Sequence, residues 1–145
     1  MTFAKRVGRY LPLLAWIVFI SFASTSEFSG ENTSRIIRPL VLWLFPHTSE
    51  ETLAVVHVVV RKIAHFSEYF VLGLLAARTF STSSKELLRR RWFILCLSLI
   101  ILYSLVDEYH QSFVPSRTPS IFDSMIDTLG GLTALLLYSR RSKRA

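Results

Sequence analysis

The sequence lacks most of the motifs by which an enzyme or a metal-binding domain is recognised. Its only cysteine, Cys96, excludes a disulfide or a thiolate metal site within one chain. It has no nucleophile elbow, Gly-rich phosphate loop or metalloprotease helix, and no internal repeat. Because Cys96 lies midway along an apolar run, we interpret it as a packing residue.

Acidic residues are also scarce. The chain has ten Asp and Glu against 17 Lys and Arg, which gives a net charge of +7. Such an excess can indicate nucleic-acid binding. Here the basic residues instead gather at the ends of apolar runs, so we expect no nucleic-acid partner.

Long apolar runs are what the sequence has in abundance, and hydrophobic residues make up 51% of it. A membrane-spanning helix needs about 20 such residues. The runs are Leu11–Ala23, Ile63–Phe80, Trp92–Val106 and Ile121–Tyr138. The second and fourth are long enough, and the other two reach that length if flanking basic residues snorkel. We predict one all-α integral membrane domain over residues 1–145, a small bundle of about four transmembrane helices.

The basic residues predict the orientation of these spans. Cytoplasmic segments carry an excess of Lys and Arg, and with four spans twelve of the 17 fall on one side. These twelve are Lys5, Arg6, Arg9, Arg78, Lys85, Arg89, Arg90, Arg91, Arg140, Arg141, Lys143 and Arg144. We therefore expect a multi-pass protein of the bacterial plasma membrane with both termini cytoplasmic. The first run also resembles a secretory signal peptide, whose cleavage would leave three spans in the same orientation.

The segment between the first two runs is predicted to lie on the outer side. Ser24–Ser34 is polar and indicates a loop, and Ile36–Phe45 is apolar but too short to span. We expect a short helix at the outer surface there, with a re-entrant segment as the alternative. Thr48 and Glu51 have the spacing of a capping box. A helix from there to the end of the second run would measure about 48 Å, so it either projects outside or breaks near Arg61.

Polar residues share a face on two of the predicted helices. At about 100° per residue, Lys62, His65 and Tyr69 fall on one arc, and Asp123 and Asp127 fall on another. Small residues continue both faces and allow close helix approach: Gly73, Ala76, Gly130 and Ala134. Ionisable groups this near hydrocarbon are costly and usually serve a function.

The end of the third span supplies a further polar set. Asp107 and Gln111 share a face with Ser104 if the helix continues that far, and Glu108 lies beside them. The predicted orientation places all three sets in the outer leaflet. We therefore predict one polar site on the outer-leaflet side.

Each candidate residue has an expected role. Lys62 and Arg117 are candidates to hold a phosphate or pyrophosphate, and Glu108, Asp123 and His65 are the candidate acids or bases. Tyr69, Gln111 and Asp127 complete the candidate binding set. We expect one cavity open to the outer leaflet to hold side chains of His65, Glu108, Arg117 and Asp123, with Arg117 contacting an acid. The ligand spacing matches no specific metal motif, so no metal is predicted and the cofactor is left open.

The same residues also have structural interpretations. Lys62 would only snorkel to the surface, and His65 would be a packing residue. Glu108 would belong to a solvated helix end, and Asp127 would form an ion pair with Arg117 or Lys62.

Two segments resemble the VanZ-like membrane proteins: RKIAHFSEYFVLG at 61–73 and DEYHQSFVPSRTPSIFDSMIDTLG at 107–130. The resemblance covers Arg61 to about Leu137, and the first span less clearly. The matching polar residues are Lys62, His65, Tyr69, Glu108, Gln111, Arg117 and Asp123. Asp127 departs from the family, in which many members have Asn, and adds a negative charge. The family takes its name from a bacterial glycopeptide-resistance protein, so the resemblance implies a cell-envelope context and no particular reaction.

Three functions follow as hypotheses. The favoured one is a membrane protein that acts on or binds an anionic, lipid-linked cell-envelope molecule, with membrane lipids or an envelope precursor as partner and a link to glycopeptide resistance. The second is a non-catalytic module that binds a lipid or a partner protein. The third is a small proton-coupled transporter, which would have to be an oligomer because four spans are few. The sequence does not decide between catalysis and binding.

Overall fold

The structure, a computed structural model, describes residues 3–25, 30–115 and 120–142, and the side chains of 7–25, 33–115 and 120–141. Six helices and no strand occur in these described ranges. They are α1 (Phe3–Ala23), α2 (Gly30–Leu44), α3 (Glu50–Ser81), α4 (Glu86–Arg90), α5 (Trp92–Gln111) and α6 (Ile121–Ser142). The predicted all-α class is confirmed for the described chain.

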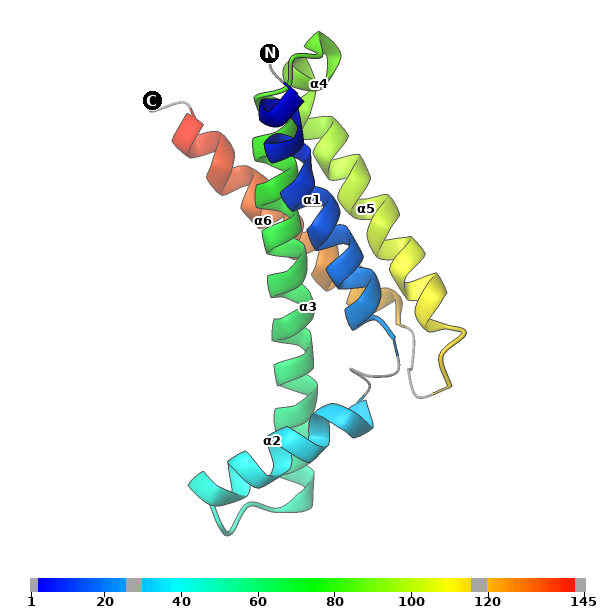
Figure 1. Ribbon diagram of the computed structural model, residues 1–145. Helices are drawn as coiled ribbons and strands as arrows, with labels where there is room; N and C mark the ends of the chain where they lie inside the picture. The colour runs from blue at the N-terminus through cyan, green and yellow to red at the C-terminus, as the bar shows by residue number, and fades with distance from the viewer. Residues whose placement is uncertain (1–2, 26–29, 116–119, 143–145) are drawn as a thin grey trace.

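Helix α3 is the centre of the bundle. It contacts α1, α2, α4, α5 and α6, and its most extensive contact is with α6. Both chain termini and α4 lie at one end of the bundle, and α2 crosses α3 at the opposite end (Figure 1). The chain therefore passes between the two ends four times, through α1, α3, α5 and α6.

The segment leading into α3 differs from the sequence prediction in two ways and decides a point that the prediction left open. Helix α2 begins at Gly30, inside the stretch predicted as a loop. The N-cap of α3 is Ser49, whose hydroxyl accepts from the Thr52 amide, so the capping box predicted at Thr48 is wrong. Helix α3 also continues without a break through Arg61. Its 32 residues measure about 48 Å, which is more than the roughly 30 Å thickness of a hydrocarbon layer.

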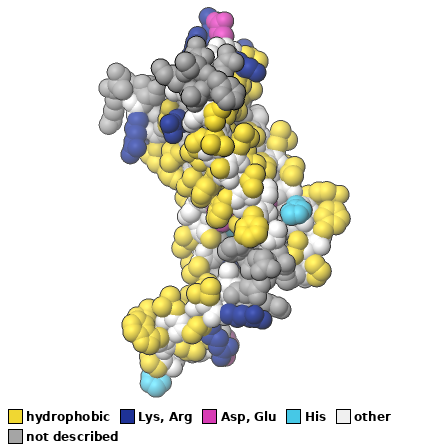
Figure 2. Space-filling model, in the orientation of Figure 1, with side chains coloured by type: hydrophobic (Ala, Val, Ile, Leu, Met, Phe, Trp, Pro, Cys, Tyr) yellow, Lys and Arg dark blue, Asp and Glu magenta, His cyan; other side chains and the backbone are white. Residues whose placement is uncertain are grey.

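The surface of the bundle is apolar and part of its interior is polar. Exposed hydrophobic side chains follow α1, α5 and α6, including Val18, Leu102 and Met125, each more than 60% exposed, and they cover much of the molecule (Figure 2). Meanwhile Asp107, Asp123 and other polar side chains are buried. Apolar surface on this scale needs a partner, and for helices of this length the partner is lipid.

Two helices, Trp92–Gln111 and Ile121–Arg141, are long and apolar enough to cross a membrane. Val7–Ala23 is a shorter apolar helix. The apolar run of α3 is interrupted by Lys62, His65 and Glu68. The apolar helices indicate a membrane protein, and a count of four spans stays a prediction.

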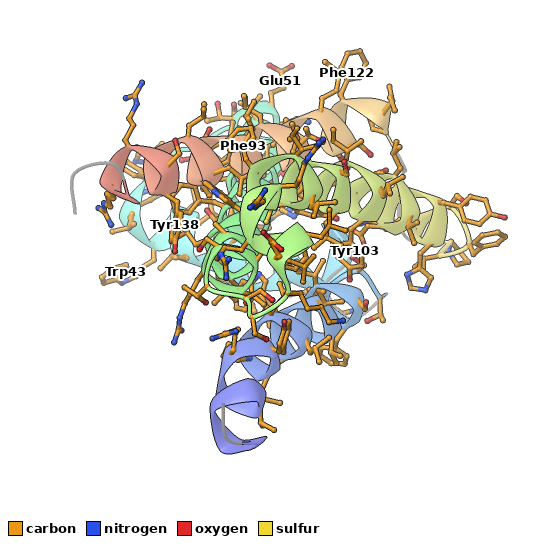
Figure 3. All side chains as sticks on the ribbon, turned by 90° about the horizontal axis from the view of Figure 1, so that it is seen from above. Trp43, Glu51, Phe93, Tyr103, Phe122 and Tyr138 are labelled. Carbon is orange, nitrogen blue, oxygen red and sulfur yellow. The ribbon has the colours of Figure 1, made fainter. Side chains whose placement is uncertain are left out.

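Tyrosine hydroxyls join neighbouring helices inside the bundle. Tyr103 points from α5 toward α1 (Figure 3), where its hydroxyl donates to the Ile17 carbonyl at 2.8 Å. The Tyr138 hydroxyl lies 2.9 Å from Ser81 Oγ and joins α6 to α3. Around these contacts lies an aliphatic core that includes Leu72 and the fully buried Cys96. Cys96 is a free thiol within the packing, in agreement with the prediction.

Candidate functional site

Close contact between α3 and α6 creates the site. A Cβ built on Gly130 would lie 2.3 Å from the carbonyl oxygen of Phe66, and one on Gly73 would lie 2.7 Å from that of Gly131. Real Cβ atoms do not come so close to backbone, so the two helices touch where glycine stands. Side chains one and two turns away are thereby brought face to face.

Asp123, in the first turn of α6, accepts from two cations of α3. Its Oδ1 lies 2.8 Å from Lys62 Nζ and its Oδ2 lies 2.9 Å from Arg61 Nη2. The Asp123 side chain is 4% exposed, whereas those of Arg61 and Lys62 are 28% and 42% exposed. Counted over these three side chains alone, the two cations exceed the carboxylate by one positive charge. The suggestion that Lys62 only snorkels is therefore incomplete, because its ammonium group pairs with an acid.

One turn deeper, His65 faces Asp127. His65 Nδ1 lies 3.1 Å from Asp127 Oδ1, and both side chains are buried. With Asp127 ionised, Nδ1 carries the donated proton and Nε2 is the nitrogen that remains for a ligand. The alternative ion pair between Asp127 and Lys62 does not form, because Lys62 pairs with Asp123; the alternative partner Arg117 lies outside the described residues.

Two buried oxygens near this pair have no hydrogen-bond partner within the described part of the chain. They are Asp127 Oδ2 and the hydroxyl of Tyr69, whose side chain is fully buried. Buried polar atoms are almost always paired with protein or water. Groups that lack a partner in the protein are therefore positions where water or a ligand would be bound.

The end of α5 contributes a second buried network. Asp107 accepts from Ser24 Oγ at 2.5 Å and from Gln111 Nε2 at 3.2 Å. Glu108 Oε2 accepts from the Ser120 amide at 2.7 Å, so this acid anchors the start of α6. Glu108 Oε1 is buried without a partner within the described residues. The continuation of the third helix through Asp107 and Gln111 is confirmed.

A cavity of about 110 Å³ lies where α2 crosses α3, and we call it the α2 cavity. Its lining comes from the end of α1, from α2, from α3 and from the end of α5. The polar lining residues are Ser24, Thr33, His57, Arg61, His65, Glu68 and Gln111. The predicted common cavity is therefore only partly correct, because His65 lines the α2 cavity but Glu108 and Asp123 do not. Arg117 lies outside the described residues.

Three residues of this arrangement were missed as site candidates. Arg61 stands next to Lys62 in the sequence but was considered only as an outer-side charge. Asp107 was recognised as sharing a face with Gln111, and its buried carboxylate is the centre of that network. Ser24 could not be identified from the sequence, because its hydroxyl donates to Asp107 only once α1 has packed near the end of α5. Among the described residues, no group of three or more His, Cys, Asp and Glu side chains is arranged to hold a metal ion.

Comparison with known proteins gives one clear relationship. The VanZ/LLP1 family model matches residues 8–142, which is a longer stretch than the motifs at 61–73 and 107–130 indicate. No curated protein and no solved structure matches the chain significantly. The matched range includes all of α3, α5 and α6 and the three polar networks that they form. The chain therefore belongs to the VanZ/LLP1 family.

Proposed function

We propose that this protein binds an anionic, lipid-linked molecule of the bacterial cell envelope at the outer leaflet, and that this binding underlies a role in glycopeptide resistance. The observation that carries the proposal is the surplus positive charge where Arg61 and Lys62 share Asp123. Guanidinium and ammonium groups are the usual protein partners of phosphate. Lys62 is exposed enough to reach a headgroup, and Arg61 faces the α2 cavity.

The topology that we propose places this charge at the outer leaflet. Four passes put both termini and α4 on one side of the membrane and α2 on the other. The basic residues of α4 and of the end of α6 lie on the side of the termini, which the positive-inside rule makes cytoplasmic. Helix α2 supports this arrangement, because its exposed Ile36, Leu40 and Trp43 suit an interfacial position.

Catalysis at the same site is the second candidate function. The observation that favours it is the buried His65–Asp127 pair, in which the carboxylate orients a histidine that lines the α2 cavity. A histidine held in this way is a candidate general acid or base. Glu108 is the other candidate acid or base, although its bond to the Ser120 amide also gives it a structural role.

A lipid-binding titration tests the proposed function. The purified protein in detergent micelles is titrated with farnesyl phosphate, with farnesol as the uncharged probe, and the complexes are counted by native mass spectrometry. We expect Lys62→Gln to weaken farnesyl phosphate binding about tenfold and to leave farnesol binding unchanged. Asp123→Asn removes the competing carboxylate, so it should preserve or strengthen phosphate binding. Arg38→Gln is the matched control, because Arg38 forms an exposed pair with Glu50 away from the site.

The outcome also separates binding from catalysis. Equal binding of farnesyl phosphate and farnesol by the wild type would contradict the proposed function. If binding is confirmed, Glu108→Gln distinguishes the two candidates, since it keeps an oxygen acceptor for the Ser120 amide but removes the acid. Loss of glycopeptide resistance in cells with lipid binding intact would indicate catalysis. Resistance that survives this change would indicate a binding module.

A further inference from the structure

The α2 cavity is built from groups that suit an anion. Its lining includes the Arg61 guanidinium, two imidazoles and the Thr33 hydroxyl, and Glu68 is the one acid among its described lining residues. The other two polar lining residues, Ser24 and Gln111, already donate to Asp107. Three of the lining groups are fixed in place by a hydrogen bond to a residue outside or beside the cavity. His65 is held by Asp127, Arg61 by Asp123, and Thr33 lies 2.9 Å from His57 Nε2. Donors fixed in this way lose little freedom when a ligand arrives.

The cavity has room for a small polar group. Its volume of about 110 Å³ is well above the roughly 10–15 Å³ that one water needs. A phosphate group can therefore enter it.

We infer that the α2 cavity is the headgroup compartment of the proposed site and that it takes one phosphate monoester, held by Arg61 and by the Nε2–H group of His65 in its protonated form. Arg61 uses Nη2 for Asp123, which leaves other guanidinium N–H groups for phosphate oxygens. His65 presents Nε2 because Nδ1 is bonded to Asp127. Ala23, Ile37 and Val60 supply an apolar part of the wall for the first carbons of the lipid. This inference rests on the proposed function and names its ligand class.

Filling the cavity without changing any charge tests this assignment. Ala64 lines the cavity from an exposed position on α3, so Ala64→Leu should fold normally and occupy the headgroup space. Ser67→Leu adds a side chain of the same size to an exposed α3 position that does not line the cavity. Thr33→Leu fills the same space from α2 and gives an independent result. Thermal unfolding of each variant establishes that it is folded before titration.

We expect Ala64→Leu and Thr33→Leu to weaken farnesyl phosphate binding at least about tenfold and Ser67→Leu to leave it unchanged. Wild-type affinity in folded Ala64→Leu, together with a Lys62→Gln defect, would place the headgroup outside the cavity and overturn this inference while the proposed function stands. Failure of the wild type to prefer farnesyl phosphate over farnesol would instead overturn both.

Inorganic phosphate distinguishes a lipid headgroup from the free anion. The apolar wall adds contacts only for a lipid, so inorganic phosphate alone should bind the wild type at least about a hundredfold more weakly than farnesyl phosphate. Equal affinities would assign the cavity to free phosphate and contradict the lipid-linked ligand.

Discussion

Adding one methyl group at Gly130 should separate α3 from α6. In Gly130→Ala the new Cβ would lie 2.3 Å from the carbonyl oxygen of Phe66. Ordinary carbon–oxygen contacts are about 3.3 Å or longer, so the backbones must move apart by about 1 Å. The atom in the way is backbone, and no side-chain rotation relieves the contact. Two other glycines provide comparisons. At Gly131 the new Cβ would meet only the side chain of Ile100, and at Gly8 it would meet nothing within 4 Å.

The magnitude follows from two opposing terms. Alanine is favoured over glycine inside a helix by up to about 1 kcal/mol, whereas overpacking a close contact costs about 1–3 kcal/mol. A gap of 0.5–1 Å also forfeits a quarter to a half of the dispersion energy of each contact that opens. For Gly130→Ala we expect a net loss of about 2 kcal/mol, which lowers the unfolding temperature by roughly 4–8 °C. Gly131→Ala should destabilise the fold by less than Gly130→Ala, because the buried Ile100 side chain rather than backbone must shift. Gly8→Ala should be neutral or slightly stabilising.

Thermal unfolding of the three variants in one detergent, followed by circular dichroism, measures this ranking. The separation would also lengthen the 3.1 Å bond between His65 and Asp127 beyond hydrogen-bond range, so Gly130→Ala should weaken farnesyl phosphate binding as well. An unfolding temperature for Gly130→Ala equal to that of Gly8→Ala would refute the close contact between α3 and α6.

Three further predictions concern the buried acids and the topology. Asp127→Ala leaves His65 buried without its partner and should destabilise the fold by about 3 kcal/mol, whereas the double variant Asp127→Leu with His65→Phe should recover most of that loss. Chemical denaturation measures the free energy of unfolding of both variants. Equal destabilisation of the single and the double variant would show that the two residues are not coupled. Glu108→Ala should destabilise the start of α6 by about 1–2 kcal/mol and Glu108→Gln by less, because only glutamine keeps an acceptor for the Ser120 amide. Equal losses of unfolding free energy in the same assay would contradict the role of Glu108 in holding the start of α6. In the proposed orientation the exposed Ser84 lies on the cytoplasmic side. Ser84→Cys, with Cys96 replaced by serine, should therefore resist an impermeant thiol reagent in intact cells and react with it after lysis. Labelling in intact cells would reverse the proposed orientation.

The helices and their polar faces were predictable because both follow from local periodicity. A 3.6-residue repeat places Lys62 and His65 on one arc and Asp123 and Asp127 on another whatever the rest of the chain does. The structure shows these two arcs facing each other across the contact between α3 and α6. Small residues on both faces were the sign that this contact could be close.

The pairing of individual charges was not predictable in the same way. Arg61 lies about 100° from Lys62 around the helix, yet its long side chain reaches the same carboxylate. The sequence also left open whether α3 breaks near Arg61, because the local pattern suits both alternatives; the helix is unbroken there. The choice of Ser49 over Thr48 as N-cap depends on where the preceding chain turns, and helix ends are set to within a residue or two by such contacts.

The buried charges are poorly explained as a source of stability. The desolvation free energy of a buried acid and its partner is about as large as the attraction between them. Replacing such a pair by apolar side chains therefore often leaves the stability of the fold unchanged or increases it. The contact between α3 and α6 already has glycine packing and an aliphatic core to hold it together. A cluster of two cations, a histidine and two acids at this contact adds little to that association, but it creates a positive edge beside a small cavity with oriented donors. The proposed ligand binding would account for that arrangement, since none of its features is needed in a helix pair that only had to pack.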